Sequence, residues 1–475
     1  MNKYRPTPDK TPTANALHPN IYLLSTVIIT VIAGFLYGYD TGIISGALLQ
    51  ITQEFDLSHN AQELVTSAIL FGAVLGALGG GKLAEIIGRR YTIMSIAVLY
   101  IVGVICCSLS ETAFWLGMSR LLLGCAVGGS SQIVPVYIAE LAPAHKRGRL
   151  VTYFNISICT GILAAGLVGA FLQHYWSWRT MISVAAVPAV ILTLGMLKLP
   201  ESPRWLVGQK RINEARKVLG MMRESDSEVV RELWSIEKVR REASKSQRAG
   251  WGELRKPYVR PALIAGLGVA AFTQLSGLEM MIYYTPTFLS DAGFSHTAAL
   301  YSALGVAVIF LVMTIIGKLL VDRVGRRKLT LIMMPWAAVS LIILGGIWLF
   351  GGDNPNNSWI IVACLFAFMV FNAGGIQVIG WLIGSELYPV AIREKAASLH
   401  AAVLWGSNLI LTGTALTLVH WLTIGGAMWF YAVLNIIGFL FVFFMVPETK
   451  GKSLESIEDD LRNNNFSPRR REAVK

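Results

Sequence analysis

Twelve long apolar runs alternate with short polar segments along the chain. An uncharged run of about 20 residues can cross the hydrocarbon of a bilayer as an α-helix, and lipid offers no partner for a backbone group left unpaired. We therefore predict an all-α membrane protein with twelve transmembrane helices. The predicted spans lie near residues 21–49, 61–83, 91–110, 113–139, 148–173, 178–199, 260–289, 298–320, 329–350, 358–385, 395–421 and 425–446.

The composition excludes a soluble enzyme. Of 475 residues, 54% are hydrophobic and only 15% are charged, far from the usage of soluble domains. The five cysteines lie inside apolar runs without metal-ligand spacing. The sequence also lacks a nucleophile elbow and a phosphate-binding loop. We therefore expect no enzymatic activity, no metal site and no cofactor.

The net charge of +12 is a topology signal rather than a sign of nucleic-acid binding. Lys and Arg crowd the even-numbered connections, around Arg89, Arg147 and Arg326, whereas the odd-numbered connections 50–62 and 290–297 contain neither. By the positive-inside rule, both termini and the long middle segment are cytoplasmic. The polar start of the chain has no apolar core ahead of a cleavage site, so the first helix does the targeting. We expect a multi-pass protein of the inner (plasma) membrane with no nucleic-acid partner.

The twelve runs fall into two sets of six. Residues 21–199 form the first half and residues 260–446 the second. The charged segment 200–259 between them has apolar positions at helical spacing, which predicts short amphipathic helices in a cytoplasmic linker. Residues 1–20 and 447–475 are predicted cytoplasmic tails.

Three motifs recur in the same order and at nearly one offset along the chain. The octapeptides Glu140 to Arg147 and Glu386 to Arg393 share Glu, Leu, Pro and Arg at positions one, two, four and eight. The other pairs are Pro200-Glu201-Ser202 with Pro447-Glu448-Thr449, and Gly88-Arg89-Arg90 with Gly325-Arg326-Arg327. An acidic residue, Glu85 or Asp322, precedes each glycine motif by three positions. We interpret the chain as two homologous halves.

Taken together, these motifs resemble those of the sugar porter family of the major facilitator superfamily. The matching segments are Gly38-Tyr-Asp-Thr-Gly42, Gly88-Arg-Arg90, Arg120, Glu140 to Arg147, Pro200-Glu-Ser-Pro-Arg204, Gln274 with Ser276-Gly277 and Tyr283-Tyr284, Asp322-Arg-Val-Gly-Arg326, Glu386 to Arg393, and Pro447-Glu-Thr-Lys450. They cover almost the whole chain. The resemblance implies two pseudo-symmetric six-helix halves, a site near the bilayer midplane, and alternating access by rocking of the halves.

Asp40 lies in an otherwise uncharged run, where an ionisable side chain is costly. One reading places it at a helix end in solvent or in a structural salt bridge. The other makes it a proton carrier, because making or breaking one contact with a cation can load or release a proton. Arg120 in the fourth span is the natural partner. In similar proteins the symporters carry Asp at this position and uniporters tend to have a non-titrating residue, so the resemblance favours proton symport.

A second set of charges is predicted at the cytoplasmic helix ends. Its members are Glu85, Arg89, Glu140, Arg147, Glu201, Arg204, Asp322, Arg326, Glu386, Arg393 and Glu448. Solvated loop charges explain the basic members but not the acids that recur in register. We interpret the set as ion pairs between the halves, closed when the cavity faces outward and broken when it opens inward. By resemblance, this is the inner gate of the family.

The resemblance also implies a solute site whose residues depart from the usual pattern. The corresponding positions are Thr273, Gln274, Glu279, Tyr283, Gln377, Trp381, Trp405 and Asn408. One of two adjacent Gln residues has become Thr273, an Asn has become Glu279, and Phe310 and Leu404 replace an Asn and a Gln. Since an unpaired buried polar group costs about 1–3 kcal/mol, these changes disfavour a common hexose. Glu279 could accept hydrogen bonds from a polyol, pair with a cationic group, or carry a second proton.

The predicted function is proton-driven uptake of a small polyhydroxylated solute by a monomer. The solute would be a monosaccharide, a polyol or a sugar derivative, and the proton gradient would be the driving force without a cofactor. Two alternatives stay open, a facilitative uniporter and a proton-coupled carrier of a charged non-sugar metabolite. A sensor on the same fold is disfavoured because the tail lacks a long cytoplasmic extension.

Overall fold

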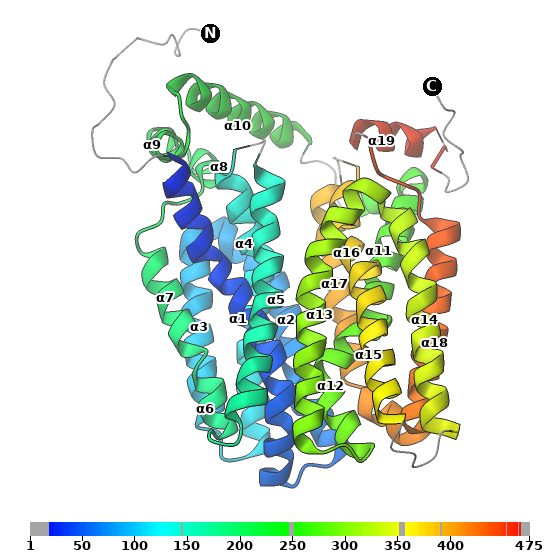
Figure 1. Cartoon of the computed structure of the whole chain (residues 1–475). Helices are drawn as coiled ribbons and strands as arrows, with labels where there is room; N and C mark the ends of the chain where they lie inside the picture. The colour runs from blue at the N-terminus through cyan, green and yellow to red at the C-terminus, as the bar shows by residue number, and fades with distance from the viewer. Residues whose placement is uncertain are drawn as a thin grey trace.

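Two helical bundles stand side by side in the computed structural model (Figure 1). The structure describes residues 19–143, 146–246, 251–350, 357–389, 392–452, 454–463 and 465–466, and these contain helices and no strand. The N-terminal bundle consists of α1 (Pro19–Phe55), α2 (His59–Ile87), α3 (Arg89–Ser108), α4 (Ala113–Leu141), α5 (Arg147–Leu172), α6 (Trp178–Ser183) and α7 (Ala186–Met196). The C-terminal bundle consists of α11 (Arg260–Leu275), α12 (Leu278–Asp291), α13 (His296–Val324), α14 (Arg326–Phe350), α15 (Asn357–Gly374), α16 (Ile376–Glu386), α17 (Arg393–Thr412) and α18 (Ala415–Met445).

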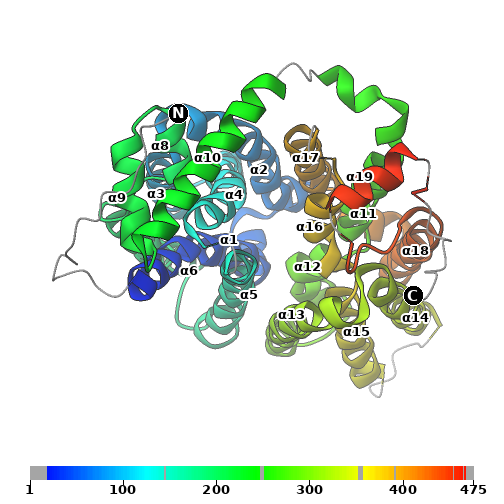
Figure 2. The same cartoon turned by 90° about the horizontal axis from the view of Figure 1, so that it is seen from above.

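Short helices gather at one end of the bundles. They are α8 (Pro203–Gly208), α9 (Ile212–Met222), α10 (Asp226–Ser246), the 3₁₀ turns η1 (Trp251–Arg255) and η2 (Pro257–Val259), and α19 (Leu454–Arg462). Seen from above, α8 to α10 lie over the N-terminal bundle and α19 lies over the C-terminal bundle (Figure 2). We call this the linker end and the opposite end the far end.

Eleven segments of the described chain are long and apolar enough to cross a membrane. The eleventh predicted span, 395–421, is not among them; it consists of α17 and the first turns of α18, with a turn between them at residues 413–414. Within α18, Thr423 leaves the helical conformation at φ 65° and ψ 168°, so the chain bends there before its last crossing. The predicted all-helical fold is confirmed.

Three further predicted spans are interrupted rather than continuous. The first span of the C-terminal bundle breaks between α11 and α12, where Gly277 has φ 95° in the left-handed region that favours glycine. The tenth span breaks between α15 and α16 near Gly375, and the sixth between α6 and α7. A break in a buried helix exposes backbone groups within the bundle, which is how transporters of this architecture form sites at membrane depth.

Glycine allows the closest helix packing in the N-terminal bundle. A Cβ atom on Gly72 of α2 would collide with the carbonyl of Leu121 on α4, and one on Gly124 of α4 would collide with the carbonyl of Ile69 on α2. Larger residues would force these backbones apart. The bundle is therefore packed tightly around the charged residues that it encloses.

Candidate functional site

A buried ion pair lies inside the N-terminal bundle. Asp40 of α1 is 2% exposed and Arg120 of α4 is fully buried. Arg120 Nη1 lies 3.7 Å from Asp40 Oδ2, and Arg120 Nε donates a 2.9 Å hydrogen bond to the carbonyl of Val65. Neither Nη atom of Arg120 nor Oδ2 of Asp40 has a hydrogen-bond partner. The structure thus brings the two predicted charges together as a loose pair, with the arginine held separately by α2.

Polar side chains of the C-terminal bundle gather at its two helix breaks. Thr273 and Gln274 end α11, and Gln377 begins α16. Thr273 Oγ1 donates to the carbonyl of Val269 at 2.7 Å. The Oε1 atoms of Gln274 and Gln377 are enclosed and have no hydrogen-bond partner. Such unpaired acceptors are costly in a finished core, so they indicate a place where a polar ligand completes the bonding.

The two tryptophans predicted to line the solute site differ in their surroundings. Trp405 of α17 is buried, and its ring lies 5.6 Å from that of Tyr37 on α1, which belongs to the other bundle. Its Nε1 donor has no partner. Asn408, one turn further along, accepts a hydrogen bond from Thr412. Trp381 is 38% exposed, so it is the predicted lining residue with the least enclosed side chain.

Glu279 lies in the first turn of α12, directly after the Gly277 break, and is 7% exposed. It forms no hydrogen bond and no ion pair with any described residue. Tyr37, Cys159 and Tyr283 are its titratable neighbours. Tyr283 is fully buried one turn further along the same helix. The buried carboxyl therefore faces neutral groups from both bundles.

Sequence reasoning missed a polar network beside this break. Ser276 Oγ donates to Asn372 Oδ1 at 3.3 Å, and Asn435 Nδ2 donates to the carbonyl of Ser276 at 2.8 Å. It also missed buried His400, whose Nδ1 is 3.0 Å from the hydroxyl of Tyr388. Each residue interrupts an apolar run, and that signal would have been enough to flag it.

The linker end of the N-terminal bundle carries a compact network of charges. Arg89 Nε donates to Glu140 Oε2 at 3.0 Å, and the Ser202 hydroxyl donates to the same oxygen at 2.5 Å. The Glu201 carboxylate accepts the backbone N–H groups of Arg89 and Arg90. Burial raises the pKa of the Glu201 carboxyl, while these N–H bonds act in the opposite direction.

The C-terminal bundle repeats the main bonds of this network. Arg326 Nη2 donates to Glu386 Oε1 at 2.9 Å, and the Thr449 hydroxyl donates to Glu386 Oε2 at 2.6 Å. The Glu448 carboxylate accepts the backbone N–H groups of Arg326 and Arg327. Arg326 also pairs with exposed Asp322 at 3.0 Å.

The expected ion pairs between the halves are not formed in this conformation. Both Arg–Glu pairs join helices of one bundle, because each carboxylate lies at the end of the span that packs against the arginine's own helix. The other predicted members take backbone partners or lie exposed. Arg147 donates to the carbonyl of Ala139, Arg393 donates to that of Tyr388, and Glu85 and Arg204 are exposed.

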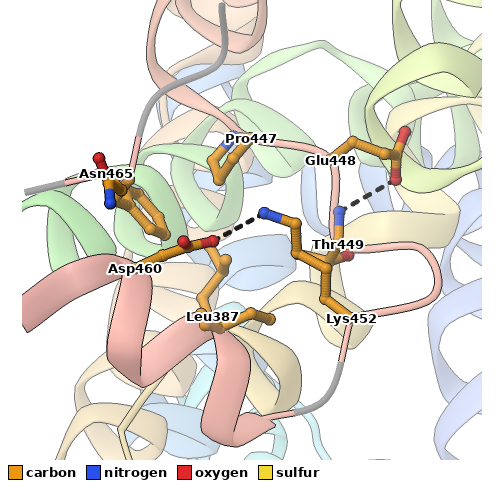
Figure 3. A pocket seen from close by; sticks show the side chains of 9 residues that line it. Leu387, Pro447, Glu448, Thr449, Lys452, Asp460 and Asn465 are labelled. Carbon is orange, nitrogen blue, oxygen red and sulfur yellow. Dashed lines mark hydrogen bonds and ion pairs between the residues drawn. The ribbon is translucent and has the colours of Figure 1, made fainter. Parts of the chain in front are cut away.

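A small pocket borders the second network (Figure 3). It lies between the 447–452 segment and α19, and Lys452 spans it to pair with Asp460 at 2.8 Å. Its lining contains none of the residues predicted to bind the solute. We interpret it as the seat of α19 on the C-terminal bundle.

At the far end, one carboxylate joins the two bundles. Glu63 of α2, which is buried, accepts the backbone N–H of Thr417 at 2.7 Å and its hydroxyl at 2.6 Å. Sequence analysis did not single out Glu63, because it lies near a span end where charges are common. The bundles also meet along α5 and α13, where Lys318 Nζ donates to the carbonyl of Thr152 at 3.3 Å.

Two membrane-embedded bundles with charged and unpaired polar groups where they meet have the architecture of a secondary transporter. The chain belongs to the Sugar (and other) transporter family, whose family model matches residues 26–461. It is 36% identical over 433 residues to the D-xylose transporter of Levilactobacillus brevis, covering 91% of this chain and 94% of that protein. It is 33% identical over 432 residues to the galactose-proton symporter of Escherichia coli, covering 90% and 92%.

A solved structure shares the fold over nearly the whole chain. The xylose transporter XylE from E. coli, in a partially occluded inward-open conformation, matches with a TM-score of 0.79 and 25% identity. The match covers 91% of this chain and all of that one. The predicted family, the major facilitator fold and the expectation of a transporter rather than an enzyme are confirmed. The chain is a multi-pass membrane protein.

Proposed function

We propose that this transporter couples the movement of a small polyhydroxylated solute to a proton by alternating access. The observation that carries the proposal is the loose pair of Asp40 and Arg120. A buried structural salt bridge is normally stabilised by short hydrogen bonds, whereas this one holds its charges at 3.7 Å with three polar atoms unpaired. A carboxylate so weakly held can exchange its cation for a proton.

The coupling follows from the two ways of neutralising Asp40. When Asp40 is charged, its attraction to Arg120 holds α1 against α4. When Asp40 takes a proton, that attraction is lost, and Arg120 keeps only its bond to the Val65 carbonyl on α2. The packing of α1 against α12 of the other bundle can then change, so proton binding biases the arrangement of the halves.

The proposed solute site lies where the helix breaks of the C-terminal bundle face α1. Gln274 and Gln377 offer unpaired acceptors, and Trp405 offers an unpaired donor beside its flat apolar face. Sugars and polyols present hydroxyls that both donate and accept, together with C–H faces that pack on aromatic rings. The relatives that transport xylose and galactose support a monosaccharide or a polyol of similar size.

The proposed orientation places the linker end in the cytoplasm of the cell, with the transporter in the plasma membrane as a monomer. The far end is closed by Glu63 and Thr417, and no described Arg–Glu pair of the linker end joins the bundles. This combination corresponds to an inward-facing state. The proton gradient is the proposed driving force.

The test is proton-driven uptake by purified protein in sealed vesicles. Radiolabelled D-xylose, D-galactose and myo-inositol are offered with and without an inward proton gradient. We expect the wild type to accumulate at least one of them, and Asp40→Asn to lose accumulation while it still exchanges labelled for unlabelled solute. Glu54→Gln is the matched control, because Glu54 is on the same helix but pairs with Arg179 at the far end. Accumulation by Asp40→Asn would reject the coupling, and gradient-independent equilibration by the wild type would favour the uniporter.

A further inference from the structure

We infer that Glu279 is a second proton site, and that the solute binds when this carboxyl is protonated. The inference rests on the proposed function, because it assigns a role within the same solute site. Asp40 and Glu279 would then serve different steps, with one carboxyl in each bundle.

The first support is the isolation of the carboxyl group. Glu279 is buried, with an exposed fraction of 7%. No described hydrogen-bond donor and no described cation contacts it. Its unpaired oxygens are not fully enclosed, unlike Oε1 of Gln274. They therefore face a space that water or a ligand can reach. A side chain that is buried, unpartnered and accessible to a small molecule belongs to a site rather than to a core.

The second support is the charge balance around it. The described titratable groups near enough to interact electrostatically with Glu279 are Tyr37 of α1, Cys159 of α5 and Tyr283 of its own helix, and none of them is a cation. Asp40 and Arg120 interact electrostatically with Tyr283, and Lys318 interacts with Cys159, but none of these three charged residues forms an ion pair with Glu279. Lys318 Nζ donates to the Thr152 carbonyl at 3.3 Å and forms no ion pair with Glu279. Among the described residues, no cation is therefore paired with Glu279.

The third support is a comparison of magnitudes. The N-terminus of α12 stabilises a nearby anion by about 0.3–1 kcal/mol, up to about 2 when partly buried. Removing an ion from water costs several kcal/mol even after relaxation. The helix end alone therefore does not offset the burial of the carboxylate, which favours a proton or a cationic ligand at this group.

A proton fits the rest of the site better than a cationic ligand. A carboxylate only accepts hydrogen bonds, whereas a protonated carboxyl donates one and accepts others, as an amide does. The described site offers unpaired acceptors at Gln274 Oε1 and Gln377 Oε1 and an unpaired donor at Trp405 Nε1, so a second donor would balance its hydrogen-bonding groups. Protonated Glu279 adds that donor for a solute hydroxyl. The proton comes from water on the side where the solute binds and returns to water where the solute leaves.

The experiment measures equilibrium binding of D-xylose and D-galactose to purified protein across a range of pH. In the wild type we expect the affinity to fall by up to about tenfold for each pH unit above the titration of the site. Glu279→Gln mimics the protonated form, so its affinity should no longer change over that range. Asp40→Asn should keep the Glu279 dependence, and Glu54→Gln should reproduce the wild-type profile.

Each outcome decides a separate claim. If Glu279→Gln keeps the wild-type pH profile, or if it loses neutral sugars at every pH while wild type binds D-glucosamine more tightly than either sugar, this inference is rejected. The transport proposal would then stand unaffected. If the folded wild type binds neither sugar and does not bind myo-inositol, the proposed function itself is wrong. Thermal unfolding of Glu279→Gln verifies that the variant is folded.

Discussion

Two buried acidic side chains at membrane depth, one in each bundle, have different surroundings. In the N-terminal bundle Asp40 has the Arg120 guanidinium 3.7 Å away, on a neighbouring helix of the same bundle. In the C-terminal bundle Glu279 has tyrosines and a cysteine as neighbours and no cation. The first carboxyl can therefore exchange one partner for another. The second carboxyl would need a proton or a cationic ligand to neutralise its charge.

At the linker end the same two bundles are nearly identical. Arg89, Glu140 and Ser202 have their counterparts in Arg326, Glu386 and Thr449, with corresponding bonds at similar lengths. The charges that pair helices within a bundle are alike in the two halves, whereas the buried charges at membrane depth differ. In the proposed mechanism the repeated network would hold each bundle together while the bundles move against one another.

The largest expected effect contrasts the two buried carboxyls. Arg120→Ala leaves Asp40 buried without its cation and should lower the free energy of unfolding by about 3–5 kcal/mol. Glu279→Gln removes a charge that has no partner and should leave stability equal or higher. Chemical unfolding in detergent micelles measures both. The double variant Asp40→Leu with Arg120→Met should recover most of the loss, and equal destabilisation by Arg120→Ala and Glu279→Gln would break the contrast.

The next effect tests the repeated frame. Gly88 and Gly325 have φ values of 93° and 105°, and a Cβ on either would strike the carboxylate of Glu201 or Glu448. Gly88→Ala and Gly325→Ala should each cost about 1–3 kcal/mol in unfolding free energy, because of the backbone strain and the clash. Gly79→Ala is the control, since its Cβ would meet nothing within 4 Å. A loss in only one of the two variants would show that the halves have different frames.

A smaller effect concerns the closure between the bundles. Glu63→Gln keeps one acceptor for Thr417 and removes the charge, which should cost about 1 kcal/mol of contact between the halves. The state open at the far end should gain about five- to tenfold in population. Labelling of Thr66→Cys by an impermeant maleimide, in a cysteine-free background, reports that opening.

Glu54→Gln is the matched control for this measurement. Glu54 also lies near the far end, but its pair with Arg179 stays within the N-terminal bundle. It should leave the labelling rate unchanged. Equal acceleration by both variants would mean that general loosening, rather than the bond between the bundles, controls the opening.

The smallest effect distinguishes the two networks from each other. Glu140→Gln should destabilise the protein slightly more than Glu386→Gln, with a difference below about 1 kcal/mol. Arg326 retains a second carboxylate in Asp322, whose side chain is 74% exposed, whereas Glu85 forms no such pair with Arg89. Adding Asp322→Asn to Glu386→Gln should remove the difference. The comparison fails if Glu386→Gln is the more damaging variant from the start.

Hydropathy alone located the crossings, because each needs a long apolar helix whatever its neighbours are. The breaks were not predictable to the same degree. Gly277 is one glycine among many in apolar runs, and only its left-handed conformation distinguishes it. The repeated motifs predicted which charges act together, but not that each arginine would choose a carboxylate of its own bundle.

The sequence predicted which residues belong to the candidate site better than it predicted which hydrogen bonds they form. Asp40 and Arg120 lie together as expected, and the structure leaves their proton role as a proposal. Asn372 and Asn435 could have been noticed as polar residues in apolar runs, but their partners are far away along the chain, and periodicity carries no information about such pairs. Trp381 shows the limit of matching by position, since its side chain is more exposed than the other proposed lining residues.

The bond between Glu63 and Thr417 has a consequence for α18 itself. Thr414, which precedes this helix, provides no side-chain bond to its first turn. Glu63 fills that role from the opposite bundle by accepting the third N–H of the helix. Separation of the bundles at the far end would therefore remove this cap, so the first turn of α18 should fray whenever the far end opens. The first-turn amide hydrogens of α18 should then exchange with solvent mainly in that open state. Their exchange rate would therefore report how often the far end opens.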